Sequence, residues 1–165
     1  MKSTSRIPLP RHSVSRTSWM GIVLLMLTLS IPALAALGGD ATTVQADQAQ
    51  IKGSLKTTQT PAYTVHEITA PAKTVIKEYV SPAGKVFAVV WQGQIIPSMA
   101  QLLGTYFDQF SQAAKAQREH QLGHRPVSIQ QPNFVFQNGG HMRAYFGRAY
   151  APALVPQGVN VDALQ

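Results

Sequence analysis

Apolar residues between positions 63 and 92 fall into three short runs that are typical of β-strands. The runs cover residues 63–68, 74–81 and 85–92, and β-branched and aromatic side chains dominate them. Only the segment Ser81-Pro82-Ala83-Gly84 separates the last two runs. Proline presets φ in a turn and glycine accepts a left-handed backbone, so the pattern predicts a β-hairpin here.

A second hairpin is predicted near the C-terminus. Residues 134–137 and 141–150 are strand-like, and they flank Asn138-Gly139, a dipeptide typical of tight turns. The segment 152–165, with its prolines and small apolar residues, is expected to wrap the surface.

Residues 99–110 carry the clearest helical pattern. Large apolar side chains recur there at spacings of three and four: Met99, Leu102, Leu103, Tyr106, Phe107 and Phe110. Such a stripe packs on a core more often than on a partner or a lipid. Ser98 and Gln101 have the spacing of a capping box, and we expect the helix to stop by Gly123. A shorter helix is predicted from an Asp40 cap to about Gly53, followed by a loop over 54–61.

These elements predict an α+β fold. We expect a small antiparallel sheet of about five strands, built from two hairpins, with one long amphipathic helix and a shorter N-terminal helix on one face.

The first 35 residues have the composition of a secretory signal peptide. Four cations (Lys2, Arg6, Arg11 and Arg16) precede an apolar run over 19–31, and Pro32 and Ala33-Leu34-Ala35 follow it. A permanent membrane anchor is the alternative, but it needs about 20 apolar residues. We therefore predict cleavage between Ala35 and Ala36, no stable membrane insertion afterwards, and a single domain over 36–165 in the periplasm or the medium.

Composition excludes several classes of protein. The chain has 165 residues and a net charge of +7, and without residues 1–35 it keeps 10 cationic and 7 acidic residues, a net charge of +3. Because these remaining cations are scattered, we expect no nucleic-acid binding. The absence of cysteine excludes disulfides, thiolate metal sites and a cysteine nucleophile.

The last predicted strand holds the best candidate contact surface. Alternation places His141, Arg143 and Tyr145 on one face, and a bulge at Gly147 lets Arg148 join them. The opposite side chains are expected in the core: Met142, Ala144 and Phe146. With Trp91 added, this surface is predicted to bind a small anionic ligand or an envelope protein. The alternative is an ordinary solvated sheet face.

Other chemistry has weaker support. His120 and His124 have helical metal-ligand spacing but lack a third ligand, and His66-Glu67 begins a zinc-protease motif that Ala70 interrupts. No nucleophile elbow or phosphate-binding glycine pattern occurs. We expect no metal, no cofactor and a non-catalytic binding role. The alternative is a hydrolase-like enzyme with a dispersed site, in which His141 meets an acid such as Glu67 or Glu78.

Four blocks of sequence point to a family. They are LGG at 37–39, EYVS with GKVFAVVWQG over 78–93, QLLGTYF at 101–107, and GGHMRAY with GRAY over 139–150. Together they resemble an uncharacterised exported proteobacterial family, the domain of unknown function 2844. Gln94 and Ser98 depart from it, since the family pattern has proline and aspartate there. The resemblance implies export and a single domain, and it implies no activity.

Overall fold

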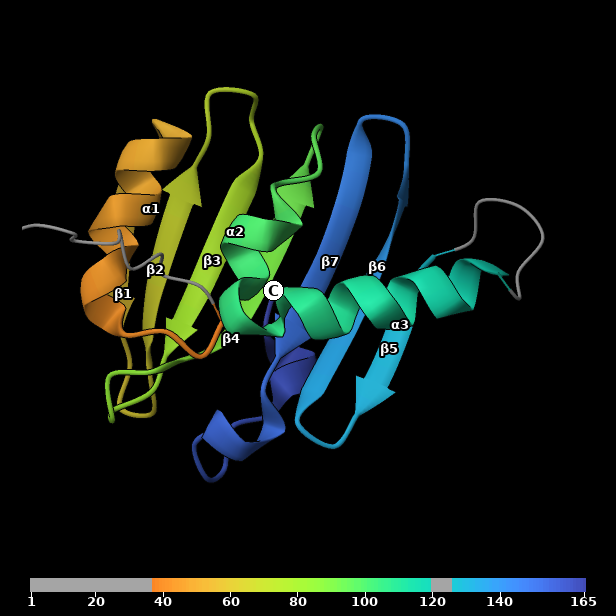
Figure 1. Ribbon diagram of the computed structural model, residues 1–165. Coiled ribbons are helices and arrows are strands. Elements are labelled where there is room, and N and C mark those ends of the chain that lie inside the picture. Colours follow the sequence, from red (N-terminus) through yellow and green to blue (C-terminus); the bar gives the residue numbers. More distant parts are fainter. Residues whose placement is uncertain (1–36, 120–125) are drawn as a thin grey trace, which may run out of the picture. The chain divides into compact units, whose positions relative to one another are not determined.

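The computed structural model describes residues 37–119 and 126–165, which form one seven-stranded antiparallel sheet with helices on one face (Figure 1). The strand order is β1-β2-β3-β4-β7-β6-β5. The strands are β1 Ser54–Gln59, β2 Thr64–Thr69, β3 Val75–Val80, β4 Val86–Gly93, β5 Ser128–Gln131, β6 Phe134–His141 and β7 Ala144–Tyr150. The mixed α+β class is confirmed, and the prediction of about five strands is wrong.

The two strands that were not predicted form the edges of the sheet. β1 occupies most of the expected loop and pairs with β2 from Ser54 opposite Thr69 to Gln59 opposite Thr64. Its sequence, SLKTTQ, shows no apolar alternation, because almost the whole strand is exposed. β5 is only four residues long and pairs with β6. Each edge strand forms because it pairs with one neighbouring strand. The local sequence of the edge strand does not reveal this pairing.

The first predicted hairpin is confirmed. β3 and β4 are joined through a turn in which Gly84 has φ +76° and donates its amide hydrogen to the Ser81 carbonyl at 2.8 Å. A register shift between Tyr79 and Val80 adds one residue to β4.

The second hairpin is longer than predicted, and its turn is displaced. β6 continues through Asn138-Gly139 as far as His141, and the two-residue turn is Met142-Arg143. The Asn138 side chain accepts a hydrogen bond from the Val127 amide at 2.7 Å, and the Asn138 amide donates to the Val127 carbonyl. Asn138 therefore extends the pairing with the β5 segment, so the turn forms further along the chain.

The helices cover one face of the sheet (Figure 1). They are η2 Ala41–Thr43, α1 Val44–Ile51, α2 Met99–Leu103, η3 Gly104–Tyr106 and α3 Phe107–Glu119. The single long helix expected from residue 99 is therefore divided, because Gly104 takes φ +48° and ψ −119°. The predicted apolar stripe does face the core, where Leu102 and Leu103 are fully buried and the other members pack around them.

The helix caps differ in part from expectation. Ser98 caps α2, since its Oγ accepts from the Gln101 amide at 3.4 Å. The Gln101 side chain does not complete a capping box, because it donates to the Asp47 carboxylate instead. Asp40 makes no side-chain cap and forms an ion pair with Lys85, 2.8 Å between Oδ1 and Nζ.

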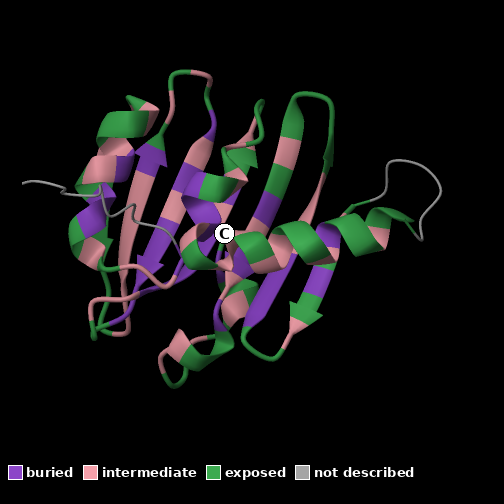
Figure 2. Cartoon of the chain, viewed as in Figure 1, coloured by how far each residue is buried: buried purple, intermediate pink, exposed green. Residues whose placement is uncertain are grey.

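Two apolar layers hold the sheet. The helix-face core joins β3, β4, β6 and β7 to the helices, and the buried surfaces concentrate along that contact (Figure 2). The opposite face carries a smaller cluster that includes Tyr79, Phe87 and Leu164. The C-terminal tail, with η4 Pro152–Leu154 and η5 Val161–Ala163, supplies Leu164 and packs on this face. We call the two sides the helix face and the tail face.

The predicted signal peptide and its cleavage point at Ala35 and Ala36 lie outside the described residues. So do His120 and His124. Over residues 37–119 and 126–165, no helix combines the length and the apolar character that crossing a bilayer requires.

Candidate functional site

The tail covers only part of the tail face, and a groove of about 860 Å³ lies on the part that stays open. Leu164 and Gln165 close one end of this groove. Its floor is formed by outward-facing residues of β3, β4 and β7, which are neighbours in the sheet. A volume of this size suits a small molecule or a short peptide segment.

The floor of the groove is apolar. Val75, Val90 and Phe146 contribute to it from three adjacent strands. Phe146 is 56% exposed, which is high for a phenylalanine within a strand. An open apolar floor of this kind favours contact with another molecule.

The rim of the groove carries mostly positive charge. Lys73, Lys77 and Arg148 line it, and Glu67 is the one acidic residue among the lining side chains. Glu67 already pairs with Lys77, 3.6 Å between Oε2 and Nζ. Arg148 pairs in turn with Asp162, so Lys73 is the lining cation without an ion pair in the described part of the chain. The groove therefore combines an apolar floor with a rim that keeps one unpaired positive charge.

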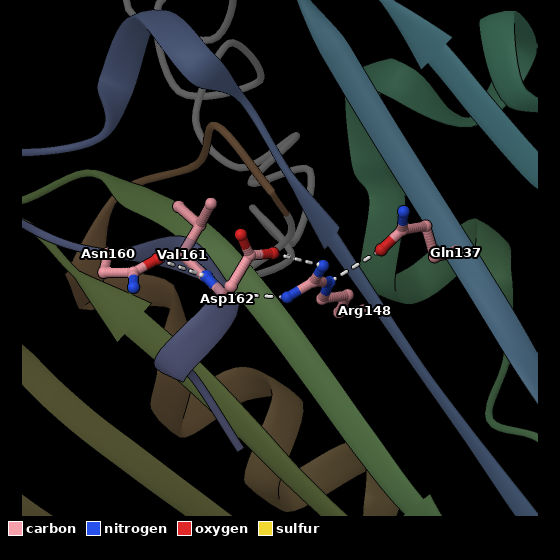
Figure 3. Close-up of polar contacts among 5 residues, drawn as sticks. All are labelled: Gln137, Arg148, Asn160, Val161 and Asp162. Carbon is pink, nitrogen blue, oxygen red and sulfur yellow. Dashed lines mark hydrogen bonds and ion pairs between the residues drawn. The ribbon is translucent and has the colours of Figure 1, made fainter.

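Arg148 links the groove to the tail (Figure 3). Its Nε donates to Gln137 Oε1 at 2.8 Å, and its two terminal nitrogens donate to the Val161 carbonyl at 3.1 Å and to Asp162 Oδ1 at 2.6 Å. Asn160 Oδ1 in turn accepts from the Asp162 amide, which fixes that turn of the tail. Arg148 thus anchors the tail to β6 and β7 and also lines the groove.

The other predicted contact residues lie near the β6–β7 turn. A hollow of about 370 Å³ there is lined by His141, Arg143 and Tyr145, together with Lys73. Arg143 stands in the turn itself with φ +65°, so it does not alternate with its neighbours as predicted. Within β7, alternation sets Tyr145 on the helix face, away from Arg148 on the tail face.

The prediction that the opposite side chains form core is wrong. Met142 is 80% exposed because it lies in the turn, and Phe146 faces the open groove. Ala144 is exposed as well. The displaced turn accounts for Met142. Ala144 and Phe146 do share one face of β7, but this is the tail face, which the tail leaves open there.

Trp91 belongs to the helix-face core. Only 2% of its surface is exposed, and its ring lies 5.5 Å from that of Phe136 between centroids. Gly147 lies directly against the indole, where any β-carbon would overlap it. Trp91 is also counted among the residues around the groove, as Arg148 is, but its indole is buried in the core and is not an exposed contact side chain.

A buried acid pair joins the helices to the sheet. Glu78 of β3 and Asp47 of α1 are fully buried, and Gln101 Nε2 donates to Asp47 Oδ1 at 3.0 Å. Burial, reinforced by the charge of Asp47, raises the pKa of Glu78 to about 9. Burial also raises the pKa of Asp47. Glu78 is therefore protonated at neutral pH, and this proton stabilises the contact between α1 and β3.

The geometry does not assemble the hydrolase-like site around His141. Glu78 is buried on the helix face, and Glu67 lines the groove while His141 lines the hollow. His66 contacts Thr57 instead, 3.0 Å between Nδ1 and Oγ1, and burial lowers its pKa. Within the described segments, no three residues of the metal-binding types His, Cys, Asp or Glu gather closely enough to hold an ion.

Sequence reasoning missed several residues of the groove. Lys77, Gln137 and Phe146 line it, and none was proposed as a contact residue. The predicted bulge at Gly147 is wrong, because β7 keeps regular register with both neighbours there. Without that bulge, strand alternation would have grouped Phe146 with Arg148. Lys77 belongs to a different hairpin, so only the strand order of the folded sheet brings it close.

The four sequence blocks lie in β3–β4, in α2 and η3, in β6–β7, and just before η2, so they surround both the core and the groove. A family model described as "Protein of unknown function (DUF2844)" matches residues 33–164. The chain belongs to this family. That match confirms the resemblance seen in the sequence blocks. No curated protein and no solved structure matches the chain.

Proposed function

We propose that the protein is exported and binds a small anionic ligand with an apolar part, without catalysing a reaction. The open groove on the tail face carries this proposal, because it joins an exposed aromatic floor to a positive rim. The floor favours the apolar part of the ligand, and Lys73, Lys77 and Arg148 favour its anionic group.

The arrangement of the cations supports binding rather than chemistry. Arg148 already donates to Gln137, Val161 and Asp162, so in the groove it contributes a fixed guanidinium rather than a free one. The anionic group of the ligand is therefore expected to be met first by the two lysines. The one acidic side chain that lines the groove, that of Glu67, is already paired with Lys77. A general acid and base working together would need a second titratable group within reach of the same ligand.

The binding part is tested with the fluorescent anion 1-anilinonaphthalene-8-sulfonate, which has both required features. We expect saturable binding that Phe146→Ser and Lys77→Gln each weaken, about tenfold for the loss of the aromatic floor. Lys115→Gln on α3 removes the same charge away from the groove and serves as the matched control. Binding that is unchanged in both groove variants, or equally reduced in the control, would show that the groove is not the site.

The export part is supported by the basic and apolar leader over residues 1–35. Cleavage between Ala35 and Ala36 would keep Leu37, which is 1% exposed and whose amide donates to the Leu102 carbonyl at 3.0 Å. Mass spectrometry of the protein from fractionated cells tests this part. We expect the periplasmic or extracellular fraction to contain a polypeptide whose mass corresponds to residues 36–165. An intact chain in the cytosol would contradict export.

A further inference from the structure

Three exposed cations in this protein hold an unfavourable backbone conformation. Lys52, Lys73 and Arg143 have φ of +55°, +57° and +65°, and they are the non-glycine residues with positive φ in the described part of the chain. Glycine or asparagine adopts this left-handed region at lower cost. These backbone conformations place three positive charges on exposed turns and loop positions.

All three cations lie at the same end of the sheet. Lys52 caps α1 just before Ser54, and Ser54 pairs with Thr69 at the end of β2. Lys73 lies in the next loop, between β2 and β3. Arg143 lies in the β6–β7 turn, beside the end of β4. We call this end of the sheet the loop end. Its β2–β3, β4–α2 and β6–β7 loops lie together at the top of the view in Figure 1.

The loop end also carries exposed apolar side chains. Ile95 is 56% exposed, Ile96 is 46% exposed and Met142 is 80% exposed. Apart from Phe146 in the groove, these are the large hydrophobic side chains that the described structure leaves exposed. The loop that holds the isoleucines is fixed to its neighbour, because Thr74 Oγ1 donates to the Ile95 carbonyl at 3.0 Å and accepts from the Ile95 amide at 3.2 Å.

Acidic residues are absent from the loop-end segments. Residues 50–54, 69–75, 93–98 and 139–147 contain no aspartate or glutamate. Asp40, by contrast, lies with Lys85 beside the β3–β4 turn, at the other end of those strands. The loop end therefore presents positive charge that no acid of the same segments neutralises.

We propose that the loop end docks on an anionic lipid surface, with Ile95, Ile96 and Met142 inserting among the headgroups. Cations close to such a surface are attracted by its negative potential, and single apolar side chains gain by leaving water at the interface. A lipid surface fits better than an acidic protein because the apolar side chains stand on two separate loops. Single apolar side chains beside cations on neighbouring loops are typical of contact with the headgroup region of a lipid surface.

The test measures co-sedimentation with vesicles of phosphatidylcholine mixed with phosphatidylglycerol, and with vesicles of phosphatidylcholine alone. We expect binding to the anionic vesicles only, and weaker binding at high salt. The protein is used as the cell produces it, with its N-terminus defined by mass spectrometry. Every variant shares that N-terminus, so any contribution of residues 1–36 is common to all.

The charge is removed with the triple variant Lys52→Gly, Lys73→Gly and Arg143→Gly. Glycine relaxes the backbone at these positions, so loss of binding cannot be explained by unfolding. Each cation is expected to contribute about fivefold, and the three together on the order of a hundredfold. The matched control is Lys85→Gln, Lys115→Gln and Arg118→Gln, which removes the same charge elsewhere.

Insertion is measured with Met142→Trp, whose fluorescence shifts to the blue when the introduced indole enters the headgroup region. The buried Trp91 gives a constant background. Met142→Gln is expected to weaken vesicle binding, and Met142→Leu to preserve it.

Three results would each overturn the proposal: absence of binding to anionic vesicles, an equal loss of binding in the control triple variant, or an emission spectrum of the Met142→Trp variant that vesicles do not shift. The first result would leave an acidic protein as the partner. Phe146→Ser tests the groove separately. Because Lys73 also lines the groove, the double variant Lys52→Gly and Arg143→Gly tests the loop end alone, so the two proposals can fail independently.

Discussion

The two faces of the sheet differ in how completely they are closed. On the helix face, α1, α2 and α3 cover the strands, and even the acids Glu78 and Asp47 are withdrawn from water. On the tail face, an irregular segment covers the cluster around Tyr79 and Phe87 and leaves the groove open. The comparison indicates that the helix face supplies most of the stability, whereas the tail face supplies a surface for binding. Substitutions of similar chemistry on the two faces should therefore have very different effects.

The largest effect is expected at Trp91, on the helix face. Trp91→Ala removes a fully buried indole that packs against Phe136 and Gly147, so it leaves a cavity in the main core. We expect the free energy of unfolding to fall by about 3–5 kcal/mol. Urea denaturation followed by circular dichroism measures the change. A loss no larger than that caused by Phe146→Ser would remove the proposed distinction between the faces.

The next effect concerns the acid pair and depends on pH. Because the pKa of Glu78 rises from 4.5 to about 9 on folding, the folded state holds its proton more tightly than the unfolded chain does. The stabilisation is fully present below pH 4.5 and is lost as the pH rises through about 9. Within that window we expect stability to fall by on the order of 1 kcal/mol per pH unit.

Glu78→Gln tests the cause of this slope. The amide keeps the shape of the protonated carboxyl group and cannot ionise, so the slope should flatten and the variant should be more stable at pH 8. Urea denaturation at several pH values gives the comparison. Glu67→Gln on the tail face is the matched control, and an unchanged slope in Glu78→Gln would show that this group is not its source.

A smaller effect is expected at the anchor of the tail. Arg148→Met keeps the aliphatic stem but loses the hydrogen bonds to Gln137, Val161 and Asp162. Since Asp162 is largely exposed, we expect a loss of about 1–2 kcal/mol rather than the cost of a buried pair. Limited proteolysis should cut the tail first in this variant. Asp162→Asn should show the same effect more weakly. If the tail of both variants resists the protease as well as the wild-type tail does, Arg148 is not its anchor.

The smallest change in stability is expected at Phe146. Its ring is 56% exposed on the tail face, so Phe146→Ser should alter the free energy of unfolding by about 0.5 kcal/mol or less. The same substitution should weaken binding of the fluorescent anion, as proposed above. Urea denaturation of the variant measures its stability, and titration of the same sample with the fluorescent anion measures its binding. A large loss of stability would place Phe146 in a structural role.

Sequence patterns predicted the strands that are buried on at least one face. β3 and β4 were placed within a residue or two, because their apolar residues fill two cores and the Pro82–Gly84 turn has a local signature. The apolar stripe of α2 and α3 was recognised for the same reason. The break at Gly104 was not predicted, since a single glycine in a helical pattern is usually tolerated.

The errors arose where distant contacts override local signals. β1 is a strand only because β2 lies beside it, and Asn138-Gly139 resembles a turn although Asn138 bonds to Val127. The predicted bulge at Gly147 separated Arg148 from Phe146, although β7 is regular there and both side chains line the groove. The acid pair was not anticipated, because nothing in the sequence near Glu78 indicates that Asp47 and Gln101 will cover it.

The strand order has a consequence for how the chain folds. β1 to β4 form one continuous meander and β5 to β7 form another, so most strand pairs are between neighbours in sequence. Only the seam between β4 and β7 requires segments far apart in the chain to meet. Each meander can begin to pair through its own hairpins. Joining the two meanders closes one long loop, which lowers the conformational entropy of the chain, and only the completed helix-face core offsets this cost. Assembly of this seam is therefore the step expected to limit the rate of folding.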